Sequence, residues 1–200
     1  MSDSPDPGFL DGPVLEVAPR LLGAVLRHGD VAVRLTEVEA YDGSNDPASH
    51  AYRGETPRSS VMFGPAGRLY VYFTYGMHHC CNVVCGAPGR ASAVLIRAGE
   101  VVDGLETARQ RRPGARDHEL ARGPALLCRA LDIDLSHNRV ELSGGEVTLT
   151  PAARRLGTVQ TGPRVGVRDG ADRRWRFWLD GEPTVSVYRP AAVRRPPAGR

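Results

Sequence analysis

The sequence predicts an α+β protein, a single compact domain built around one antiparallel sheet. Its 200 residues suit one domain with one sizeable core. Short apolar stretches that alternate or are rich in aromatic residues recur between turn residues and predict strands. Helical spacing is confined to three stretches, and no internal repeat or heptad is present. We therefore expect strands joined mainly by turns and loops, with helices flanking the sheet.

The two ends of the chain differ in composition from the part between them. Residues 1–13 are acidic and rich in proline, and residues 190–200 are rich in proline and arginine. Such segments bury too little apolar surface to fold alone. We predict a disordered leader over 1–13, a folded domain over 14–189 and a disordered tail over 190–200.

The first half of the domain is predicted to hold one helix and five strands. In order these are a helix over 14–22, a hairpin over 23–39 with its turn at 28–30, a long polar loop over 42–60, hairpin strands at 69–75 and 80–85, and a strand at 92–97. A loop as long as 42–60 inside a compact domain is usually functional or disordered. Its arginine, histidine and tyrosine content favours a functional loop.

The second half is predicted to begin with helices and to end in strands. The helices are expected at 104–112 and 124–131, and the strands at 146–150, 164–167, 175–179 and 185–188. This arrangement completes the α+β prediction.

The composition excludes two kinds of chemistry. The net charge is only +3, and the chain contains no lysine, so all 26 basic side chains are arginine. Without an ε-amino group, lysine Schiff-base chemistry and a P-loop lysine are unavailable.

Cys80, Cys81 and Cys85 crowd into one apolar run, which is not the spacing of a secreted disulfide framework. With no signal peptide and no membrane-spanning stretch, we expect a cytoplasmic protein with reduced thiols.

Glu39 and Arg97 are the charged residues whose positions in predicted strands most suggest chemistry. By alternation, Glu37 and Glu39 should continue the face of the preceding apolar residues, Val31, Val33 and Leu35. A buried carboxylate is costly unless it has partners and a task. The alternative is that the strand ends earlier and both glutamates are solvated. Arg97 closes an apolar strand and would need an anion if buried, for which Glu39 is the obvious candidate.

The segment from Glu37 to Asn82 combines this carboxylate with aromatic rings and arginines. That combination suits hydrolysis of a nucleoside bond on a base taken out of duplex DNA. The segment also resembles the alkyladenine (3-methyladenine) DNA glycosylase family, in the same order and over about Arg20 to Tyr188. The matching blocks are Val38-Glu39-Ala40-Tyr41, 46–50, Thr56-Pro57-Arg58, Met62-Phe63, 69–76, Asn82, 94–98, 104–107, Gly123-Pro124, 164–167 and 185–187.

The resemblance implies a compact domain with a curved sheet and a protruding β-hairpin. It also implies a monofunctional enzyme that flips alkylated or deaminated purines (3-methyladenine, 7-methylguanine, hypoxanthine type) out of double-stranded DNA. Water would then displace the base in one step, without a metal or organic cofactor. We expect a monomer.

Site residues follow from the same resemblance. Glu39 would be the general base, and Arg97 and the backbone carbonyl of Val165 would help it to hold the water. Tyr41 and His50 would stack on one face of the base and Tyr72 on the other, where cation–π attraction favours charged alkylated purines. Asn82, at the pocket floor, would disfavour guanine.

The predicted DNA contacts lie on the hairpin and the polar loop. Tyr75 would be the wedge that fills the gap left by the flipped nucleotide, with Met77 and His78 beside it at the tip. Arg53 and Arg58 are phosphate candidates, because a guanidinium fork matches phosphate oxygens, although solvated surface arginines would look the same. After Gly123-Pro124-Ala125 the family usually has a basic residue, whereas this chain has Leu126.

Two alternatives remain open from the sequence. The run His78, His79, Cys80, Cys81 and Cys85 could suggest a metal, but adjacent strand residues point to opposite faces and the spacing is not that of a zinc ribbon, so we predict buried thiols and no metal. A non-catalytic nucleic-acid-binding module could also use this sheet and aromatic hairpin. A pure binder would have no use for Glu39 paired with Arg97.

Overall fold

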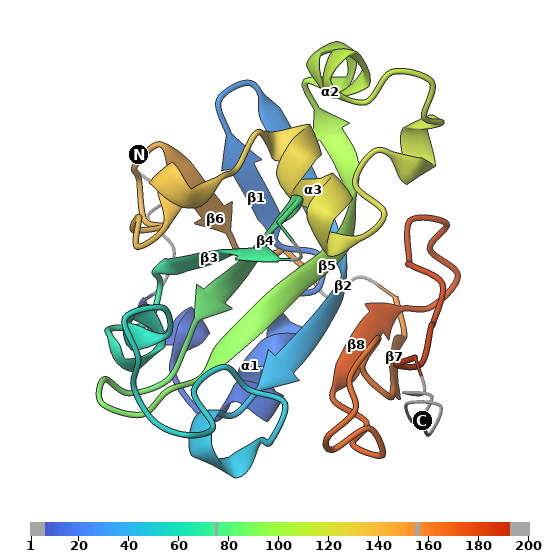
Figure 1. Cartoon of the computed structure of the whole chain (residues 1–200). Helices are drawn as coiled ribbons and strands as arrows, with labels where there is room; N and C mark the ends of the chain where they lie inside the picture. Colours follow the sequence, from blue (N-terminus) through green and yellow to red (C-terminus); the bar gives the residue numbers. More distant parts are fainter. Residues whose placement is uncertain (1–6, 75, 155–156, 193–200) are drawn as a thin grey trace, which may run out of the picture.

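One eight-stranded antiparallel sheet organises the computed structural model, which describes residues 7–74, 76–154 and 157–192 (Figure 1). Strands follow the order β3-β4-β5-β2-β1-β6, and β8 joins β2 while β7 joins β8. Their bounds are β1 Val25–His28, β2 Val31–Tyr41, β3 Leu69–Thr74, β4 His78–Val84, β5 Ala93–Asp103, β6 Val147–Thr150, β7 Val159–Gly162 and β8 Arg176–Leu179. The predicted α+β class with one antiparallel sheet is confirmed.

Long strand β2 makes the sheet curl. One edge of β2 pairs with β5 along almost its whole length. The other edge pairs first with β1, over Val31–Arg34, and then with β8, over Glu37–Glu39. Because β2 changes partners along this edge, the sheet opens into two arms. The second arm brings β7 and β8 beside the end of β2.

In the described part of the chain, three α-helices cover the sheet: α1 Val14–Arg20, α2 Leu105–Arg111 and α3 Pro124–Leu131. Figure 1 shows α3 in front of the central strands and α1 behind them. Pro124 begins α3, where its missing N–H costs nothing, and Asp132 ends it in the left-handed conformation with φ 59°. The three helices match the predicted segments. Short 3₁₀ turns lie at η1 Pro7–Leu10, η2 Gly43–Asn45, η3 Ser60–Phe63, η4 Asp117–Glu119 and η5 Leu135–His137.

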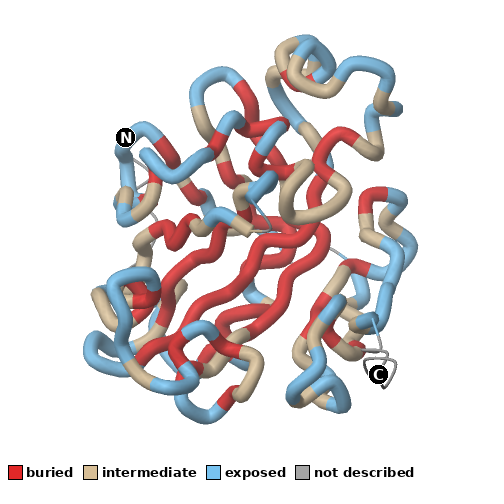
Figure 2. Tube along the Cα trace, in the orientation of Figure 1, coloured by how far each residue is buried: buried red, intermediate tan, exposed pale blue. Residues whose placement is uncertain are grey.

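The core lies between the helices and the central strands, which Figure 2 shows as a nearly continuous buried band. Leu21, Leu26, Ile96, Leu127 and Leu131 are all 0% exposed. Each such side chain stabilises the fold by about 1.5–3 kcal/mol through burial. No helix among the residues that the structure describes is long and apolar enough to cross a membrane.

A pair of register shifts interrupts the β2–β5 ladder at Glu37. Strand β2 has an extra residue, Thr36, and β5 then has its own, Arg97. At the neighbouring Gly99, a Cβ would lie 2.4 Å from the carbonyl oxygen of Arg34, so this close approach requires glycine. The bulges place Glu37 and Arg97 at the same irregular point of the sheet.

These bulges reverse the alternation of β2. Before them the side chains in the apolar core are Val31, Val33 and Leu35, and after them Val38 and Ala40. Glu37 and Glu39 therefore lie on the face opposite the core residues that follow the bulge. The expectation that both glutamates continue the face of the earlier residues is wrong, although both side chains are completely buried.

Two predicted strands are not strands. Residues 164–167 form a turn, and residues 185–188 have no regular structure. Their backbone groups bond to side chains instead: the N–H of Val165 donates to Glu39 and the N–H of Ser186 donates to Glu37. Buried carboxylates thus take the place of a partner strand.

The ends of the chain and the hairpin tip are described in part. Within the predicted leader, the turn η1 packs Phe9 and Leu10 against the core. Strands β3 and β4 pair as the predicted hairpin, and β4 begins at His78. Tyr75 lies outside the described residues, and protrusion of the hairpin stays a prediction.

Candidate active site

Glu39 lies near the end of β2, between β5 and β8, and its side chain is 0% exposed. Its Oε2 accepts a hydrogen bond from the Tyr41 hydroxyl at 3.0 Å. Its Oε1 accepts one from the backbone N–H of Val165 at 2.7 Å and lies 3.4 Å from Nη1 of Arg97. A buried carboxylate with three polar partners is what a positioned general base requires.

Burial raises the pKa of Glu39 above its ordinary value. The charge of Arg97 and the hydrogen bonds from Val165 and Tyr41 act in the opposite direction without cancelling the effect of burial. Glu39 is therefore a stronger base than an exposed glutamate. A raised pKa moves a carboxylate toward the range in which general bases work best.

Glu37 is the principal partner of Arg97. The Nε of Arg97 donates to Glu37 at 2.9 Å, a shorter contact than its 3.4 Å approach to Glu39. Glu37 also accepts from Nε of Arg176 at 2.7 Å, and from the hydroxyl and backbone N–H of Ser186 at 2.9 and 2.6 Å. The predicted Arg97–Glu39 pair is thus part of a larger buried group, in which Glu37 holds the arginine beside Glu39.

A second buried ion pair anchors the segment that carries Val165. Nη2 of Arg164 donates to Asp46 at 2.8 Å, Nη1 donates to the carbonyl of Ala40 at 2.9 Å, and both charged side chains are 0% exposed. The Arg164 guanidinium also lies 4.6 Å from the centre of the Tyr41 ring. Arg164 therefore fixes the backbone next to Val165 and supports Tyr41 at the same time.

His50, Tyr70 and Tyr72 form an aromatic group on the other side of the site. Nδ1 of His50 is 2.8 Å from the Tyr70 hydroxyl, and the His50 ring meets that of Tyr72 edge-on at 4.6 Å between centroids. Arg58 lies 5.0 Å from the centre of the Tyr72 ring and 3.4 Å from Nε2 of His50. Because an arginine only donates, Nε2 is the accepting nitrogen and Nδ1 carries the proton.

Two consequences follow for His50. Burial, and then the charge of Arg58, lowers its pKa to about 4, so the ring is neutral at neutral pH. Its contact with Tyr72 also leaves no room for a base between them, since stacked rings need about 3.5–4 Å on each side. The predicted grouping of His50 with Tyr41, opposite Tyr72, is therefore wrong in this structure: His50 and Tyr72 are neighbours.

Asn82 is buried in β4, opposite Tyr70 of β3. Its Nδ2 donates to the carbonyl of Tyr70 at 3.0 Å, which fixes the amide beside the aromatic group. Met77 is 69% exposed and His78 is also exposed, at the start of β4. Arg53 is exposed on the polar loop. The structure thus brings Asn82 to the rings and leaves Arg53, Arg58, Met77 and His78, the predicted DNA contacts that it describes, at the surface.

A family model described as methylpurine-DNA glycosylase (MPG) matches residues 8–183. The chain belongs to this family. Relatives from Streptomyces avermitilis and Frankia casuarinae are 55% and 54% identical, and the matches cover 94% of this chain and 92% and 93% of the relatives. A third, from Cutibacterium acnes, is 49% identical over 90% of this chain and 98% of its own length. All three are named "Putative 3-methyladenine DNA glycosylase".

Membership confirms the resemblance seen in the sequence and makes the chain a DNA glycosylase, a hydrolase of DNA repair. Several residues of this candidate site were missed by sequence reasoning. Glu37 had a signal, because it shares a strand face with Glu39. Tyr70 had the same kind of signal, because it shares a strand face with Tyr72. Arg176 and Ser186 had none, since they reach the site only through the tertiary fold.

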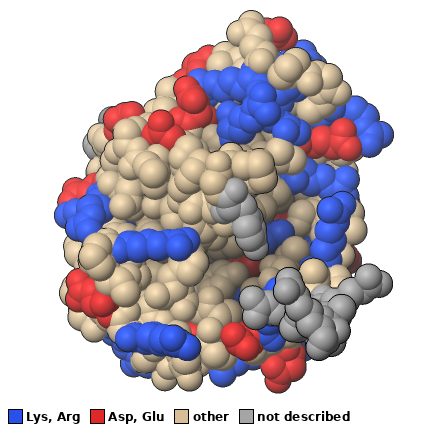
Figure 3. All heavy atoms as spheres, viewed as in Figure 1, with Lys and Arg blue, Asp and Glu red and all other residues tan. Residues whose placement is uncertain are grey.

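Arginines on this face of the glycosylase are divided into separate groups. Figure 3 shows the largest group at the top of the view, over α2 and α3, with carboxylates between the groups. Arg112, Arg122 and Arg129 line a hollow of about 460 Å³ there, next to Leu126. Burial, and then the charge of Arg129, lowers the pKa of Arg112. An anion at this hollow would relieve the repulsion between these side chains.

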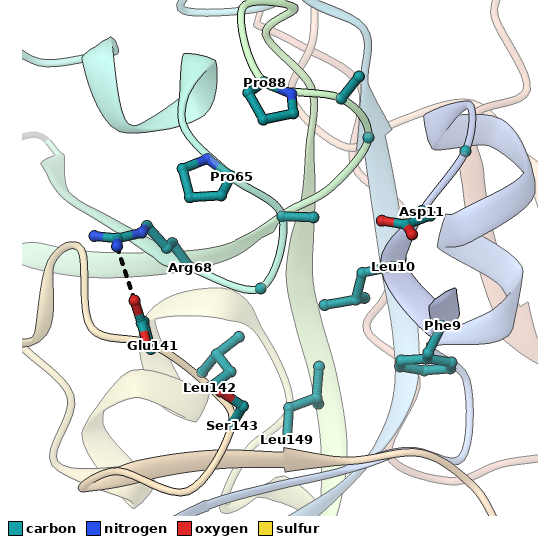
Figure 4. Close-up of a pocket in the computed structure, with 15 residues that line it drawn as sticks. Phe9, Leu10, Asp11, Pro65, Arg68, Pro88, Glu141, Leu142, Ser143 and Leu149 are labelled. Carbon is teal, nitrogen blue, oxygen red and sulfur yellow. Dashed lines mark hydrogen bonds and ion pairs between the residues drawn. The ribbon is translucent and has the colours of Figure 1, made fainter. Parts of the chain in front are cut away.

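Figure 4 shows a larger hollow, of about 690 Å³. Leu10, Leu142 and Leu149 form its apolar walls, and an ion pair of 2.8 Å joins Arg68 to Glu141 at its edge. None of the residues that contact Glu39 lines this hollow. The hollow is therefore separate from the group around Glu39.

Proposed function

We propose that this glycosylase hydrolyses the N-glycosidic bond of alkylated or deaminated purines in double-stranded DNA and leaves the strand uncut. The observation that carries the proposal is the buried Glu39 carboxylate, held by Tyr41 and Val165 beside Arg97. A protein that only gripped DNA would gain nothing from an ionisable group kept in so costly a position. Membership of the methylpurine-DNA glycosylase family supports the same reaction.

In the proposed step, Glu39 takes a proton from a water molecule whose oxygen attacks C1′ of the sugar. The bond from C1′ to the purine nitrogen breaks, and its electron pair leaves with the base. A base that is positively charged by alkylation becomes neutral on leaving, so it is a good leaving group. Since Glu39 has no exposed surface, the attacking water would lie in an enclosed position, away from bulk solvent.

Arg97 and Val165 would act through the carboxylate. The N–H of Val165 fixes the orientation of Glu39, and the nearby charge of Arg97 favours its ionised form. We further propose that the backbone carbonyl of Val165 accepts a hydrogen bond from the same water. These contacts hold the Glu39 carboxylate and the attacking water in place before the reaction. Less entropy is then lost on reaching the transition state, and the barrier is lower.

The flipped purine would lie between Tyr41 on one side and Tyr72 with His50 on the other. Electron-rich rings attract a cationic base by about 0.5–2 kcal/mol for each contact. Because its pKa is about 4, His50 is uncharged at neutral pH and does not repel such a base. Asn82 would reject guanine sterically, because its amide is buried and hydrogen-bonded to the backbone, and cannot move aside for the exocyclic amine.

The hairpin and the arginines would bind the duplex. We propose Tyr75 as the wedge that replaces the flipped nucleotide, with Met77 and His78 beside it. The 69% exposure of Met77 is a large apolar surface of the kind that contacts a partner. Arg53, Arg58 and the arginine-lined hollow beside Leu126 would contact phosphates. The protein would act as a monomer.

Release of methylated bases from alkylated duplex DNA, with the Glu39→Gln variant alongside, tests the reaction. The wild-type protein should release alkylated purines, and the variant should bind the same DNA equally well but release no base. Single-turnover release by the variant at a tenth of the wild-type rate or more would remove Glu39 from the role of base. Tight binding without release by the wild type would instead support a non-catalytic binding module.

A further inference from the structure

His28, His137 and Glu146 come together at a place that is separate from the Glu39 group. They lie at the end of β1, the end of η5 and immediately before β6. The Nε2 atoms of the two histidines are 3.2 Å apart. Oε1 of Glu146 lies 3.2 Å from Nε2 of His28 and 3.0 Å from Nε2 of His137. Three atoms that can each donate an electron pair therefore converge on one point.

The remaining ring nitrogens are held by the protein. Nδ1 of His28 is 2.7 Å from the carbonyl oxygen of Leu131, which can only accept, so Nδ1 carries the proton and Nε2 is left with a lone pair. Nδ1 of His137 accepts the backbone N–H of Asp134 at 3.1 Å, and it also lies 3.0 Å from a carboxylate oxygen of Asp134 and 3.3 Å from the Ser136 hydroxyl. Donation from Nδ1 to the Asp134 carboxylate would free Nε2 of His137 as well.

Two arrangements of protons are possible at His137. If Nδ1 accepts from the Asp134 N–H, Nε2 carries the proton and donates to Glu146 at 3.0 Å, whereas binding of a cation requires the proton on Nδ1, facing the Asp134 carboxylate. With both histidines neutral and protonated at Nδ1, three lone pairs face one another at 3.0–3.2 Å. A backbone carbonyl on one histidine and a carboxylate on the other are the supports that metal-binding histidines commonly have. Tetrahedral zinc with bonds of about 2.0–2.1 Å has ligand atoms about 3.3 Å apart, close to the observed separations.

We propose that His28, His137 and Glu146 bind a divalent metal ion of the Zn²⁺ class. Two imidazoles and one carboxylate suit zinc, and a fourth, open position would take a water. The side chain of Glu146 is 62% exposed, so the ion can enter from solvent without a change of fold.

The metal ion would have a structural task. It would tie β1 and β6 to the connection between α3 and β6. That connection supports β3: Oδ1 of Asn138 accepts the N–H of Val71, and the N–H of Arg139 donates to Leu69. Strand β3 carries the rings of the base pocket, Tyr70 and Tyr72. Metal binding would therefore stabilise the support of that strand without taking part in hydrolysis.

The test is calorimetric titration of the untagged, chelator-treated full chain with ZnCl₂. We expect one equivalent to bind and the melting temperature to rise with zinc. Glu146→Ala and His137→Ala should each lose this binding, and Asp134→Ala should weaken it about 10–100-fold. His118→Ala, which removes a histidine of η4 outside the group, should change nothing. Since Glu146 is exposed, its variant should keep the wild-type melting temperature in the absence of metal.

X-ray absorption of the zinc-loaded protein identifies the ligands. A first shell of nitrogen and oxygen at about 2.0–2.1 Å, with imidazole scattering beyond it, is the expected spectrum. A sulfur shell at about 2.3 Å would place the ion on the cysteines and overturn the proposal. No binding by the wild type, or unchanged binding in both Glu146→Ala and His137→Ala, would also overturn the proposal. His28, His137 and Glu146 would then be held together by hydrogen bonds alone.

Discussion

The backbone N–H of Val165 donates to the carboxylate of Glu39 at 2.7 Å, across 126 residues of sequence. This bond joins the turn after β7 to the end of β2, and Arg164 locks the same turn onto Asp46. The position of the Glu39 carboxylate thus depends on a backbone segment that no side-chain motif reveals. The Val165 N–H is therefore not available to a partner strand, and residues 164–167 form a turn.

We expect base release to fall on acidification at a higher pH than an ordinary glutamate would give. Burial raises the pKa of Glu39 above 4.5, and the base acts only when ionised. The rate should therefore rise with pH through this raised value. Single-turnover release of an alkylated purine, measured across the acidic range on stable protein, gives the midpoint. A midpoint at or below 4.5 would contradict the prediction.

The raised pKa of Glu39 should also make thermal stability depend on pH, but stability should fall with rising pH where the rate of base release rises. A raised pKa in the folded state contributes stability that is present below the unfolded-state pKa and is lost as the pH rises through the folded-state value. Glu39→Gln, which cannot ionise, should therefore gain stability relative to the wild type between acidic and neutral pH. Melting temperatures of the two proteins over that range measure the difference. A difference that is constant with pH would argue against a raised pKa.

Glu37→Gln should destabilise the protein by about 3–5 kcal/mol, because it leaves the buried guanidinium groups of Arg97 and Arg176 without their shared anion. Glu100→Gln is the matched control: its half-exposed carboxylate pairs with Arg34 at 2.6 Å and should contribute no more than about 1 kcal/mol. Urea unfolding of both variants gives the free energies. Similar losses in the two would show that burial does not distinguish the pairs.

Asn82→Ser should widen selectivity toward guanine. A smaller side chain leaves space for the exocyclic amine that the fixed amide is proposed to exclude. Release of guanine and of hypoxanthine from matched duplexes measures the change. Asn138→Ser serves as control, since it also removes a side-chain hydrogen bond to β3, at Val71, but Asn138 follows η5 and is not part of β4. Selectivity that moved equally in both variants would point to a loosened β3 instead.

Borohydride should trap no covalent complex with lesion DNA. The usual nucleophile for a Schiff base at the abasic sugar is lysine, and the chain has none. A denaturing gel after incubation with borohydride, with a lysine-dependent glycosylase as positive control, should show a shifted band in the control alone. A trapped adduct of this protein would contradict displacement by water.

The local sequence determined those helices and hairpins whose own residues show apolar periodicity, caps or turn preferences. The helix α3 begins at Gly123-Pro124 and has an apolar face, and the hairpins of β1–β2 and β3–β4 follow from apolar runs on either side of turn residues. The absence of lysine excludes lysine Schiff-base chemistry on composition alone. The motif around Glu39 indicated the family because its residues lie close together along the chain.

Tertiary structure decided what depends on distant partners. The bulges at Thr36 and Arg97 reverse the face of Glu37 and Glu39, which alternation alone could not predict because the extra residues arise from the pairing of two strands. Likewise, His28 and Glu146 are 118 residues apart and meet only when β1 pairs with β6. Alternation and turn preference act over a few residues, whereas the burial and pairing of charges are settled by the whole fold.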